Sequence, residues 1–309
     1  MNDHWNGRRP AGRVAYVNGR YVRHGAAGVH VEDRGLQLGD SVYEVFRIEN
    51  GHLRDEEEHL DRLQRSLGEI EMAMPTGRGA LKSVMAETVR RNGARDALLY
   101  LQVTRGAFKR DHPIPPAAAK PTLILTVHPL DTAAVARRHD EGVAVVTCAD
   151  ERWGRCDIKS TQLLANLLAK TAARRAGALE AWLVDREGFV TEGASTTAWI
   201  VDRAGMVVTR DLGHAILPGV TRRVILEAAA EARLPVVERR FTSEEAASAR
   251  EAFLSSAAGG AVPVIEIDRC TVGDGRPGPV TRRVMALYAK RSQERFAKEN
   301  DVTGPHTGL

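Results

Sequence analysis

The sequence predicts a two-lobed α+β protein. The chain of 309 residues is long enough to bury a large core, and its 43% hydrophobic and 27% charged residues are typical of a soluble globular protein. Strand-like and helix-like segments lie on both sides of a proline-rich break at residues 106–121. We therefore expect a smaller N-terminal α/β lobe at residues 1–130 and a larger C-terminal lobe at residues 131–309, with the boundary near residues 128–131.

The first lobe is expected to open with a leader and a hairpin. The leader, residues 1–12, is polar and is expected to be disordered. Asn18 and Gly19 lie between two short strand-like runs, residues 14–17 and 21–23. This pair indicates a hairpin turn, because both central positions of such a turn need positive φ, which Asn and Gly adopt readily.

The alternating stretch at residues 41–48 predicts a strand that follows a glycine-punctuated loop at residues 33–40. Successive side chains of a strand point to opposite faces. The sequence therefore places Tyr43 and Val45 on one face and Val42, Glu44 and Phe46 on the other. The other elements expected in this lobe are a turn at Asn50-Gly51, helices at residues 56–70 and 81–91, and strands at residues 98–104 and 123–127.

Four prolines, at positions 113, 115, 116 and 121, exclude regular structure from residues 106–121. Beyond this break, short apolar runs predict strands and longer periodic runs predict helices. The strands are expected at residues 143–148, 181–184, 198–201, 207–209, 236–237, 252–254 and 262–267. The helices are expected at residues 161–176, 221–232, 243–249 and 280–298, before a frayed tail at residues 300–309.

Bulk properties exclude several classes of protein. The net charge is only +4, and charges of both signs are interspersed without a basic stripe, so we expect no nucleic-acid partner. No apolar run approaches the length of a membrane span, and we expect no signal peptide because the N-terminal residues are mostly polar. The three cysteines form no disulfide framework or metal motif, which favours a reducing cytoplasm and predicts no metal.

Lys159 is the strongest catalytic candidate. It lies between a predicted strand and a predicted helix, and Trp153, Cys156, Ile158 and Leu163 surround it in the sequence with apolar bulk. An ammonium group in such surroundings loses hydration, and the free amine becomes available for Schiff-base chemistry.

Three motifs occur with this lysine in one order: RCDIKS at residues 155–160, VTEGAS at 190–195 and LPGVTR at 217–222. Together they resemble the fold-type IV, pyridoxal-phosphate-dependent aminotransferases, and within them the D-amino-acid transaminases most. The similarity runs from about Tyr16 to about Ala289. It implies a C-terminal lobe with a β-barrel-like sheet and pyridoxal 5'-phosphate as cofactor.

The resemblance implies that Lys159 binds the cofactor and moves a proton to and from the substrate Cα. Glu192 would hold the protonated pyridine nitrogen, which makes the ring an electron sink. The phosphate would bind at the start of a helix, where free backbone N–H groups and the helix dipole favour an anion, and at an arginine. The residues implied for the cofactor are Lys159, Glu192, Arg62, Leu217, Gly219, Val220, Thr221, Ser195, Thr196, Ser256 and Ala257.

The D-amino-acid branch is distinguished by a trap for the substrate carboxylate. The resemblance assigns this role to Tyr43, Arg110 and His112. In an extended segment, residues two apart face the same way, so Arg110 and His112 can converge on one anion. Family members place this loop over the neighbouring subunit's site, which implies a homodimer.

The chain departs from the family at three places. Ala257 stands where relatives usually offer a threonine hydroxyl to the phosphate, and Ser256 is the neighbour able to compensate. Thr196-Thr197 replaces a serine-rich segment, and Phe108-Lys109 is bulkier than the family's loop. The preferred side chain of the substrate therefore stays open.

The sequence thus predicts a ping-pong transaminase that moves an amino group from a D-amino acid, such as D-alanine, to a 2-oxo acid, such as 2-oxoglutarate, giving D-glutamate. A branched-chain L-amino-acid transaminase or an (R)-amine transaminase on the same scaffold is the nearest alternative, and Arg110 and His112 argue against both. A fold-type IV lyase or a non-catalytic carrier of pyridoxal phosphate fits the sequence less well. A carrier would need neither the electron sink nor the carboxylate trap.

Overall fold

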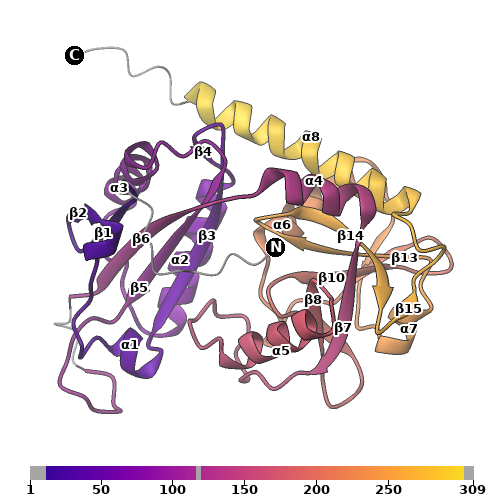
Figure 1. Ribbon diagram of the computed structural model, residues 1–309, viewed down its shortest axis with the longest axis horizontal. Helices are drawn as coiled ribbons and strands as arrows, with labels where there is room; N and C mark the ends of the chain where they lie inside the picture. The colour runs from indigo at the N-terminus through magenta and orange to yellow at the C-terminus, as the bar shows by residue number, and fades with distance from the viewer. Residues whose placement is uncertain (1–11, 116–119, 303–309) are drawn as a thin grey trace. The chain divides into compact units, whose positions relative to one another are not determined.

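The computed structural model describes residues 12–115 and 120–302, with side chains described up to residue 295 (Figure 1). The chain divides into two compact units, Met1–Leu130 with Lys159–Thr161, and Asp131–Ile158 with Gln162–Leu309. Residues 1–11 of the expected leader and most of the expected frayed tail lie outside the described residues.

The first unit is built on a six-stranded sheet in the order β2-β1-β6-β5-β3-β4. All of its strand pairs are antiparallel. Helix α2 packs on β3, and α3 packs on β1 and β6. The strands are β1 (Val14–Val17), β2 (Arg20–Arg23), β3 (Ser41–Glu49), β4 (His52–Leu53), β5 (Ala97–Thr104) and β6 (Thr122–Pro129), and the helices are η1 (His24–Ala26), α1 (Arg34–Leu38), α2 (Glu56–Glu69) and α3 (Arg78–Arg91).

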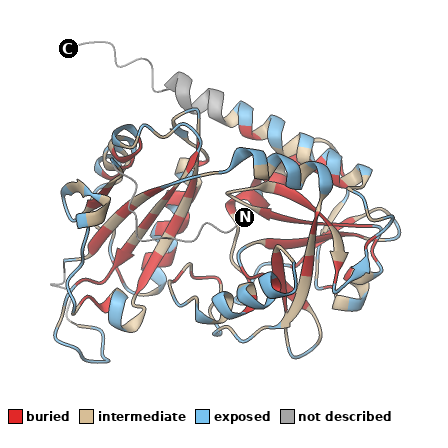
Figure 2. Ribbon diagram, viewed as in Figure 1, coloured by how far each residue is buried: buried red, intermediate tan, exposed pale blue. Residues whose placement is uncertain are grey.

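Strand β3 has the two faces that its sequence predicted. Val42, Glu44 and Phe46 are fully buried, whereas Tyr43 and Val45 are half-buried. The buried face lies under α2, where the Phe46 ring packs on the His59 ring with 4.9 Å between centroids. Apolar side chains of α2 and β5 fill the same layer, which is red in Figure 2.

A segment from much later in the chain extends the edge of β3. The Tyr43 N–H donates to the Lys159 carbonyl at 2.9 Å, and the Thr161 N–H donates to the Ser41 carbonyl at 3.1 Å. Val42 and Ser160 form the antiparallel bridge between these bonds. Residues 159–161 therefore belong to the first unit, although the chain on both sides of them belongs to the second.

The second unit contains a nine-stranded sheet, in which eight strands follow the order β12-β11-β10-β13-β14-β7-β8-β9 and β15 pairs with β14. The last strand of this path leads into β10 through only residues 194–196, so the sheet must curl back on itself. This confirms the expected barrel-like sheet. The strands are β7 (Val143–Ala149), β8 (Glu180–Val184), β9 (Val190–Gly193), β10 (Thr197–Val201), β11 (Val207–Thr209), β12 (Val236–Glu238), β13 (Glu251–Ser256), β14 (Gly260–Ile267) and β15 (Cys270–Thr271).

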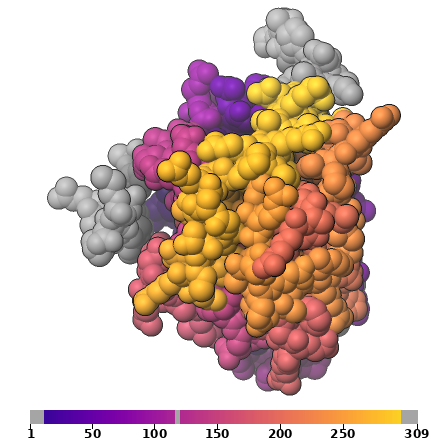
Figure 3. All heavy atoms as spheres, turned by 90° about the vertical axis from the view of Figure 1, so that its right-hand side faces the viewer, coloured from indigo at the N-terminus to yellow at the C-terminus, as the bar shows by residue number. Residues whose placement is uncertain are grey.

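Helices cover the outside of this sheet, and apolar side chains fill its inside. Trp182, Ile200 and Leu254 belong to the inner cluster, whereas Trp199 and Phe253 stack at 5.2 Å beneath α6 and α8. In Figure 3 the yellow α8 adjoins the orange residues of the same unit. The helices are α4 (Thr132–Glu141), α5 (Leu164–Arg175), α6 (Val220–Glu231), α7 (Ser243–Ala247) and α8 (Pro279–Val302).

Most of the predicted strands and helices are present, with ends shifted by a few residues. The turn residues Asn18 and Gly19 have the expected positive φ of 46° and 86°. The prediction of a loop at residues 33–40 is wrong in part, because α1 occupies residues 34–38 of it. The Asp33 side chain accepts from the Gly35 N–H and caps this helix. Helix α4 was missed because none of its residues is buried, so it carries no apolar period.

One buried carboxylate fixes the start of α8. Glu251 on β13 accepts from the Val280 N–H at 3.0 Å and the Thr281 N–H at 2.7 Å. Its neighbour Gly278 leaves the necessary space, since a Cβ there would lie 2.1 Å from the Glu251 carboxyl carbon. Glu251 thereby joins the longest helix to the middle of the sheet.

We expect Glu251→Ala to lower the free energy of unfolding by about 1–3 kcal/mol, because two helix N–H groups lose their acceptor. Chemical denaturation measures this change. Glu231→Ala is the matched control, since Glu231 is 60% exposed in its pair with Arg291 and should cost no more than about 0.5 kcal/mol. Equal losses for the two variants would contradict the capping role.

Candidate active site

Lys159 is held in the first unit from two sides. Its carbonyl is bound by β3, and its N–H donates to the Ser66 hydroxyl of α2 at 3.3 Å. Its amine lies over the ring of Tyr43, 4.3 Å from the centroid. Tyr43 in turn stacks on Tyr100 with 5.6 Å between centroids. Two residues expected to serve cofactor and substrate therefore lie together on the half-buried face of β3.

Tyr100 was missed by the sequence reasoning. Burial, with a smaller effect of Tyr43, raises its pKa to about 12, so its phenol stays neutral. Its hydroxyl donates to Gln102 at 2.9 Å, and the Gln102 amide donates to the Ser41 hydroxyl at 3.2 Å. This chain of hydrogen bonds fixes the aromatic wall beside Lys159.

Arg62 lies on the buried face of α2, in a network of charged groups. Its Nε and Nη2 donate to the two carboxylate oxygens of Glu44, both at 2.8 Å, and His59 Nδ1 donates to the same carboxylate at 2.8 Å. Burial alone would raise the pKa of Glu44, but Arg62 and His59 outweigh burial and lower that pKa to about 2. Burial lowers the pKa of His59, which favours a neutral imidazole that donates through Nδ1.

The Glu44 carboxylate therefore fixes the guanidinium plane of Arg62 through a two-bond fork. The phosphate-binding role of Arg62 that the resemblance implies stays a prediction. The sequence placed Glu44 on the face of β3 opposite Tyr43 but gave no signal of its burial or of its pairing with α2.

The Glu44 pKa makes stability depend on pH. A carboxyl whose pKa falls from 4.5 in the unfolded chain to about 2 in the folded chain stabilises the fold above pH 4.5 and loses that contribution as the pH falls towards 2. Between pH 5.5 and pH 3, Glu44→Gln should lose about 2 kcal/mol less stability than the wild type. Denaturation at the two pH values measures this difference, and Glu69→Gln, an exposed site at the end of α2, is the control. Parallel pH profiles for Glu44→Gln and the wild type would contradict the pairing.

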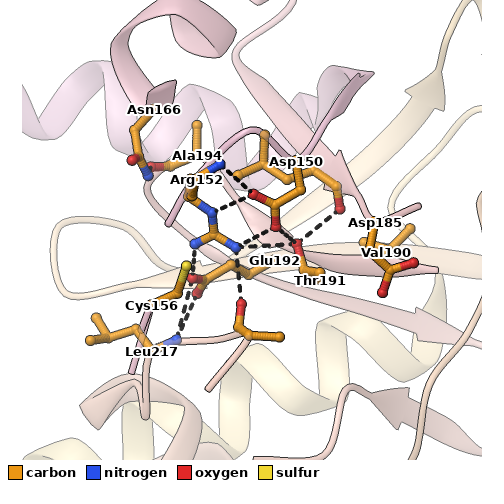
Figure 4. Close-up of polar contacts among 12 residues, drawn as sticks. Asp150, Arg152, Cys156, Asn166, Asp185, Val190, Thr191, Glu192, Ala194 and Leu217 are labelled. Carbon is orange, nitrogen blue, oxygen red and sulfur yellow. Dashed lines mark hydrogen bonds and ion pairs between the residues drawn. The ribbon is translucent and has the colours of Figure 1, made fainter. Parts of the chain in front are cut away.

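In the second unit, Glu192 lies in β9 and is only 6% exposed (Figure 4). Its two carboxylate oxygens accept from the Leu217 N–H at 3.3 and 3.2 Å. Arg152 Nη1 donates to the same carboxylate in a close ion pair. Glu192 is thus a buried carboxylate with a fixed orientation.

Arg152, which the sequence reasoning missed, is itself fixed by several acceptors. Its Nε and Nη2 donate to Asp150 at 2.9 and 2.8 Å, and Nη2 also donates to the Ala215 carbonyl at 3.0 Å. Burial opposes its charge, but Asp150 and Glu192 outweigh burial and raise the pKa of Arg152. Burial raises the pKa of the neighbouring Cys156 thiol to about 11, so this cysteine stays protonated at neutral pH. All three cysteines are free, as expected.

The start of α6, where the phosphate is expected to bind, lies in the same unit as Glu192. Gly219 has extended backbone and supplies no side-chain cap, and the first turn carries no acidic residue. The first helical residues, Val220 and Thr221, are buried. The Leu217 N–H is bound to Glu192, and α6 begins three residues after Leu217. The carboxylate of Glu192 is therefore hydrogen-bonded to the segment that leads into the helix.

The remaining expected cofactor residues differ in their surroundings. The Thr196 hydroxyl oxygen is buried and has no hydrogen-bond partner among the described residues. Ser195 is exposed and donates to the buried Glu180 carboxylate at 2.7 Å. Ser256 accepts from the Gly259 N–H at 3.2 Å, so it closes the turn that contains Ala257.

These residues fit pyridoxal phosphate. In the second unit, a buried carboxylate suits its pyridinium nitrogen, an uncapped helix start suits its phosphate, and the buried Thr196 hydroxyl, which has no partner among the described residues, is a group that a ligand would satisfy.

Arg110 and His112 are exposed, and within the part of the chain that the structure describes neither side chain has a hydrogen-bond partner. The backbone bends at both residues, so this segment is not the simple extended stretch that was expected. The described residues contain no cluster of His, Cys, Asp or Glu that could hold a metal, and no helix long and apolar enough to cross a membrane.

Residues 41–267 match the family model of the amino-transferase class IV proteins. This chain belongs to that family, the fold-type IV aminotransferases, and is a pyridoxal-phosphate-dependent aminotransferase.

Two curated relatives are D-alanine aminotransferases. That of Bacillus licheniformis is 39% identical over 281 residues, covering 91% of this chain and 98% of the relative. That of Staphylococcus haemolyticus is 35% identical and covers 91% and 98% of the two chains.

Two solved structures with similar folds are branched-chain amino acid aminotransferases. That of Escherichia coli has a TM-score of 0.82 at 27% identity, covering 90% of this chain and 94% of that chain. The T.th. enzyme, solved with pyridoxamine 5'-phosphate, has a TM-score of 0.82 at 26% identity, covering 91% and 94% of the two chains.

We expect borohydride reduction of the cofactor-loaded protein to attach the cofactor to Lys159, because this amine lies against Tyr43 on the face of β3. Peptide mapping by mass spectrometry locates the label. Lys170, whose amine is paired with Glu180 at 2.9 Å, should remain unlabelled, and Lys159→Ala should remove the label. A label on Lys170 in the wild type would contradict the assignment.

Proposed function

We propose that this aminotransferase transfers an amino group from a D-amino acid, such as D-alanine, to a 2-oxo acid, such as 2-oxoglutarate, giving D-glutamate in a ping-pong reaction. The names of the relatives that are 35–39% identical support this choice. The observation that carries it is the pair Arg110 and His112, two side chains able to bind a carboxylate on one exposed loop.

Pyridoxal phosphate, when bound, supplies a carbonyl carbon that accepts the amino group and a ring that accepts the electron pair of the substrate Cα–H bond. We propose that Lys159 binds this cofactor covalently and, once the substrate amine has displaced it and freed its own amine, carries the proton from the substrate Cα. The Tyr43 ring limits where its amine can lie.

Glu192 is proposed to keep the proton on the pyridine nitrogen. The Arg152 cation and the Leu217 N–H hold its carboxylate in one orientation before the cofactor binds, so little reorganisation is needed. The N–H groups of Val220 and Thr221 and the guanidinium of Arg62 are proposed to bind the phosphate. Thr196, whose hydroxyl has no partner in the described part of the chain, is the next proposed ligand. Leu217, Gly219, Ser195, Ser256 and Ala257 are proposed to line the cofactor.

The substrate carboxylate is proposed to bind Arg110, His112 and the Tyr43 hydroxyl. Exposure of Arg110 and His112 in a single chain agrees with a role in the site of a second copy, so we propose a homodimer in which this loop serves the neighbouring subunit. Free thiols at all three cysteines support a reducing compartment, and we propose the cytoplasm.

A branched-chain L-amino-acid transaminase is the second candidate. The solved structures that support it are branched-chain aminotransferases at 26–27% identity, which is lower than the identity to the D-alanine aminotransferases. The two candidates predict different results in one measurement, the absorbance change of the holoenzyme on adding an amino acid. A D-amino-acid transaminase should respond to D-alanine, and a branched-chain transaminase should respond to L-leucine.

We expect Arg110→Ala to lower kcat/KM for D-alanine by roughly 30- to 1000-fold, because losing one charged partner of a bound carboxylate costs about 2–4 kcal/mol. Activity towards (R)-1-phenylethylamine, which has no carboxylate, should change little. Steady-state kinetics with the two donors measure this contrast.

Lys120→Ala is the matched control, since it removes an exposed cation from the other end of the same proline-rich segment and should affect neither donor. An equal loss on both donors in Arg110→Ala would mean that Arg110 supports the fold or the dimer. Full activity on D-alanine would favour the branched-chain alternative.

A further inference from the structure

A buried arginine from another part of the first unit donates hydrogen bonds to the loop that carries Arg110 and His112. Arg34, at the start of α1, is 5% exposed. Its Nη1 donates to the Asp111 carbonyl at 2.7 Å, and its Nη2 donates to the His112 carbonyl at 3.3 Å. One guanidinium thus binds two successive peptide groups of the loop, in the segment proposed to bind the substrate carboxylate.

The other edge of Arg34 is fixed by Asp40. Arg34 Nε donates to Asp40 Oδ2 at 2.8 Å, and Arg105 Nε donates to the same oxygen at 2.7 Å. Arg105 also donates to the Ile70 carbonyl at 2.6 Å, just beyond α2. Burial alone would raise the pKa of Asp40, but the hydrogen bonds from Arg105 and Arg34 outweigh it and lower that pKa.

The backbone around Arg34 is equally well fixed. The Arg34 N–H donates to the Gly106 carbonyl at 2.9 Å, and Asp33 accepts both the Gly35 N–H at 2.8 Å and the Thr104 hydroxyl at 2.9 Å. A Cβ on Gly35 would lie 2.4 Å from a Thr104 methyl carbon, so glycine is required there. The Asp33-Arg34-Gly35 motif therefore consists of a cap, a side chain that binds the loop, and a close approach to β5.

Arg34 binds only backbone atoms of the loop. The side chains of Arg110 and His112 stay exposed, while the peptide groups on either side of His112 are held in place. An ordered loop loses less conformational entropy when it binds a ligand than a loop that must be ordered at that moment. Holding the backbone thus favours carboxylate binding without occupying the groups that bind it.

We propose that Arg34 is a positioning residue for substrate specificity: it holds the Arg110–His112 segment in the conformation that recognises the carboxylate of the amino donor. This inference rests on the proposed function. It predicts that Arg34 affects donors with a carboxylate and leaves donors without one nearly unchanged.

Arg34→Lys tests the proposal, because lysine keeps the charge near Asp40 but cannot bind two carbonyls and a carboxylate with one planar group. In the cofactor-loaded full-length protein, kcat/KM for D-alanine should fall about 10- to 100-fold, mainly through a higher KM, as expected for a misplaced binding group. The value for (R)-1-phenylethylamine should stay within about threefold of the wild type if the reacting groups are undisturbed. Hydrogen–deuterium exchange of the peptide covering residues 107–115 should rise.

Arg105→Lys is the matched control. It disturbs the same Asp40 carboxylate but has no bond to residues 110–112 in the described structure, so any loss should be equal for the two donors and loop exchange should not change. If Arg34→Lys does not yield folded holoenzyme, Thr104→Val removes the hydroxyl bound by Asp33. This variant should raise both the loop exchange and the KM for D-alanine, as Arg34→Lys is expected to do. Wild-type values of both quantities would overturn the proposal.

The outcomes separate the two hypotheses. An unchanged KM for D-alanine in Arg34→Lys, beside a strong loss in Arg110→Ala, overturns the role of Arg34 and leaves the proposed function intact. An equal loss on both donors, or unchanged loop exchange, also overturns it. Full D-alanine activity in Arg110→Ala would overturn the proposed function, and the role of Arg34 in specificity with it.

Discussion

Two backbone hydrogen bonds attach residues 159–161 to the first residues of β3, and the arrangement of the first unit's candidate groups depends on them. The pairing brings Lys159 to a strand more than a hundred residues earlier in the chain. Because side chains alternate along β3, one face presents Tyr43 to the lysine amine, and the other presents Glu44 to α2. A single strand therefore supports both the proposed reacting amine and the proposed phosphate-binding arginine.

Each candidate cofactor residue with a buried charge has a partner of opposite charge. Arg62 is bound by Glu44, and Glu192 is bound by Arg152, whose remaining donors are used by Asp150 and a carbonyl. An unpaired buried charge would be costly, so these partners allow the charges to be buried, and their hydrogen bonds also fix orientation. Arginine suits both places, because a planar guanidinium can bind a carboxylate on one edge and further acceptors on another.

Specificity is proposed to lie elsewhere, in a loop without regular structure. The same scaffold occurs in relatives named for D-alanine and in solved structures named for branched-chain amino acids. This is expected where rigid elements hold the reacting groups and loops select the substrate. In this chain the loop is joined to a rigid base through Arg34, so its proposed selectivity would depend on residues that never touch the substrate.

The sequence by itself determined the family, most strands and helices, the two turns with positive φ, and which side chains share each face of β3. These features follow from local chemistry: alternation, turn residues, and short motifs in a fixed order.

The tertiary structure decided which charges meet. Arg152, Tyr100 and the Glu44–His59–Arg62 network gave no sequence signal, because their partners are distant in the chain or belong to elements whose packing no local pattern records. The solvent-exposed α4 lacked an apolar stripe. From its sequence alone, Asp33-Arg34-Gly35 is typical of a loop, and only the structure showed the cap of α1 and the bonds from Arg34 to the Asp111 and His112 carbonyls. Such contacts depend on how distant segments pack, and a single sequence records only what each segment favours locally.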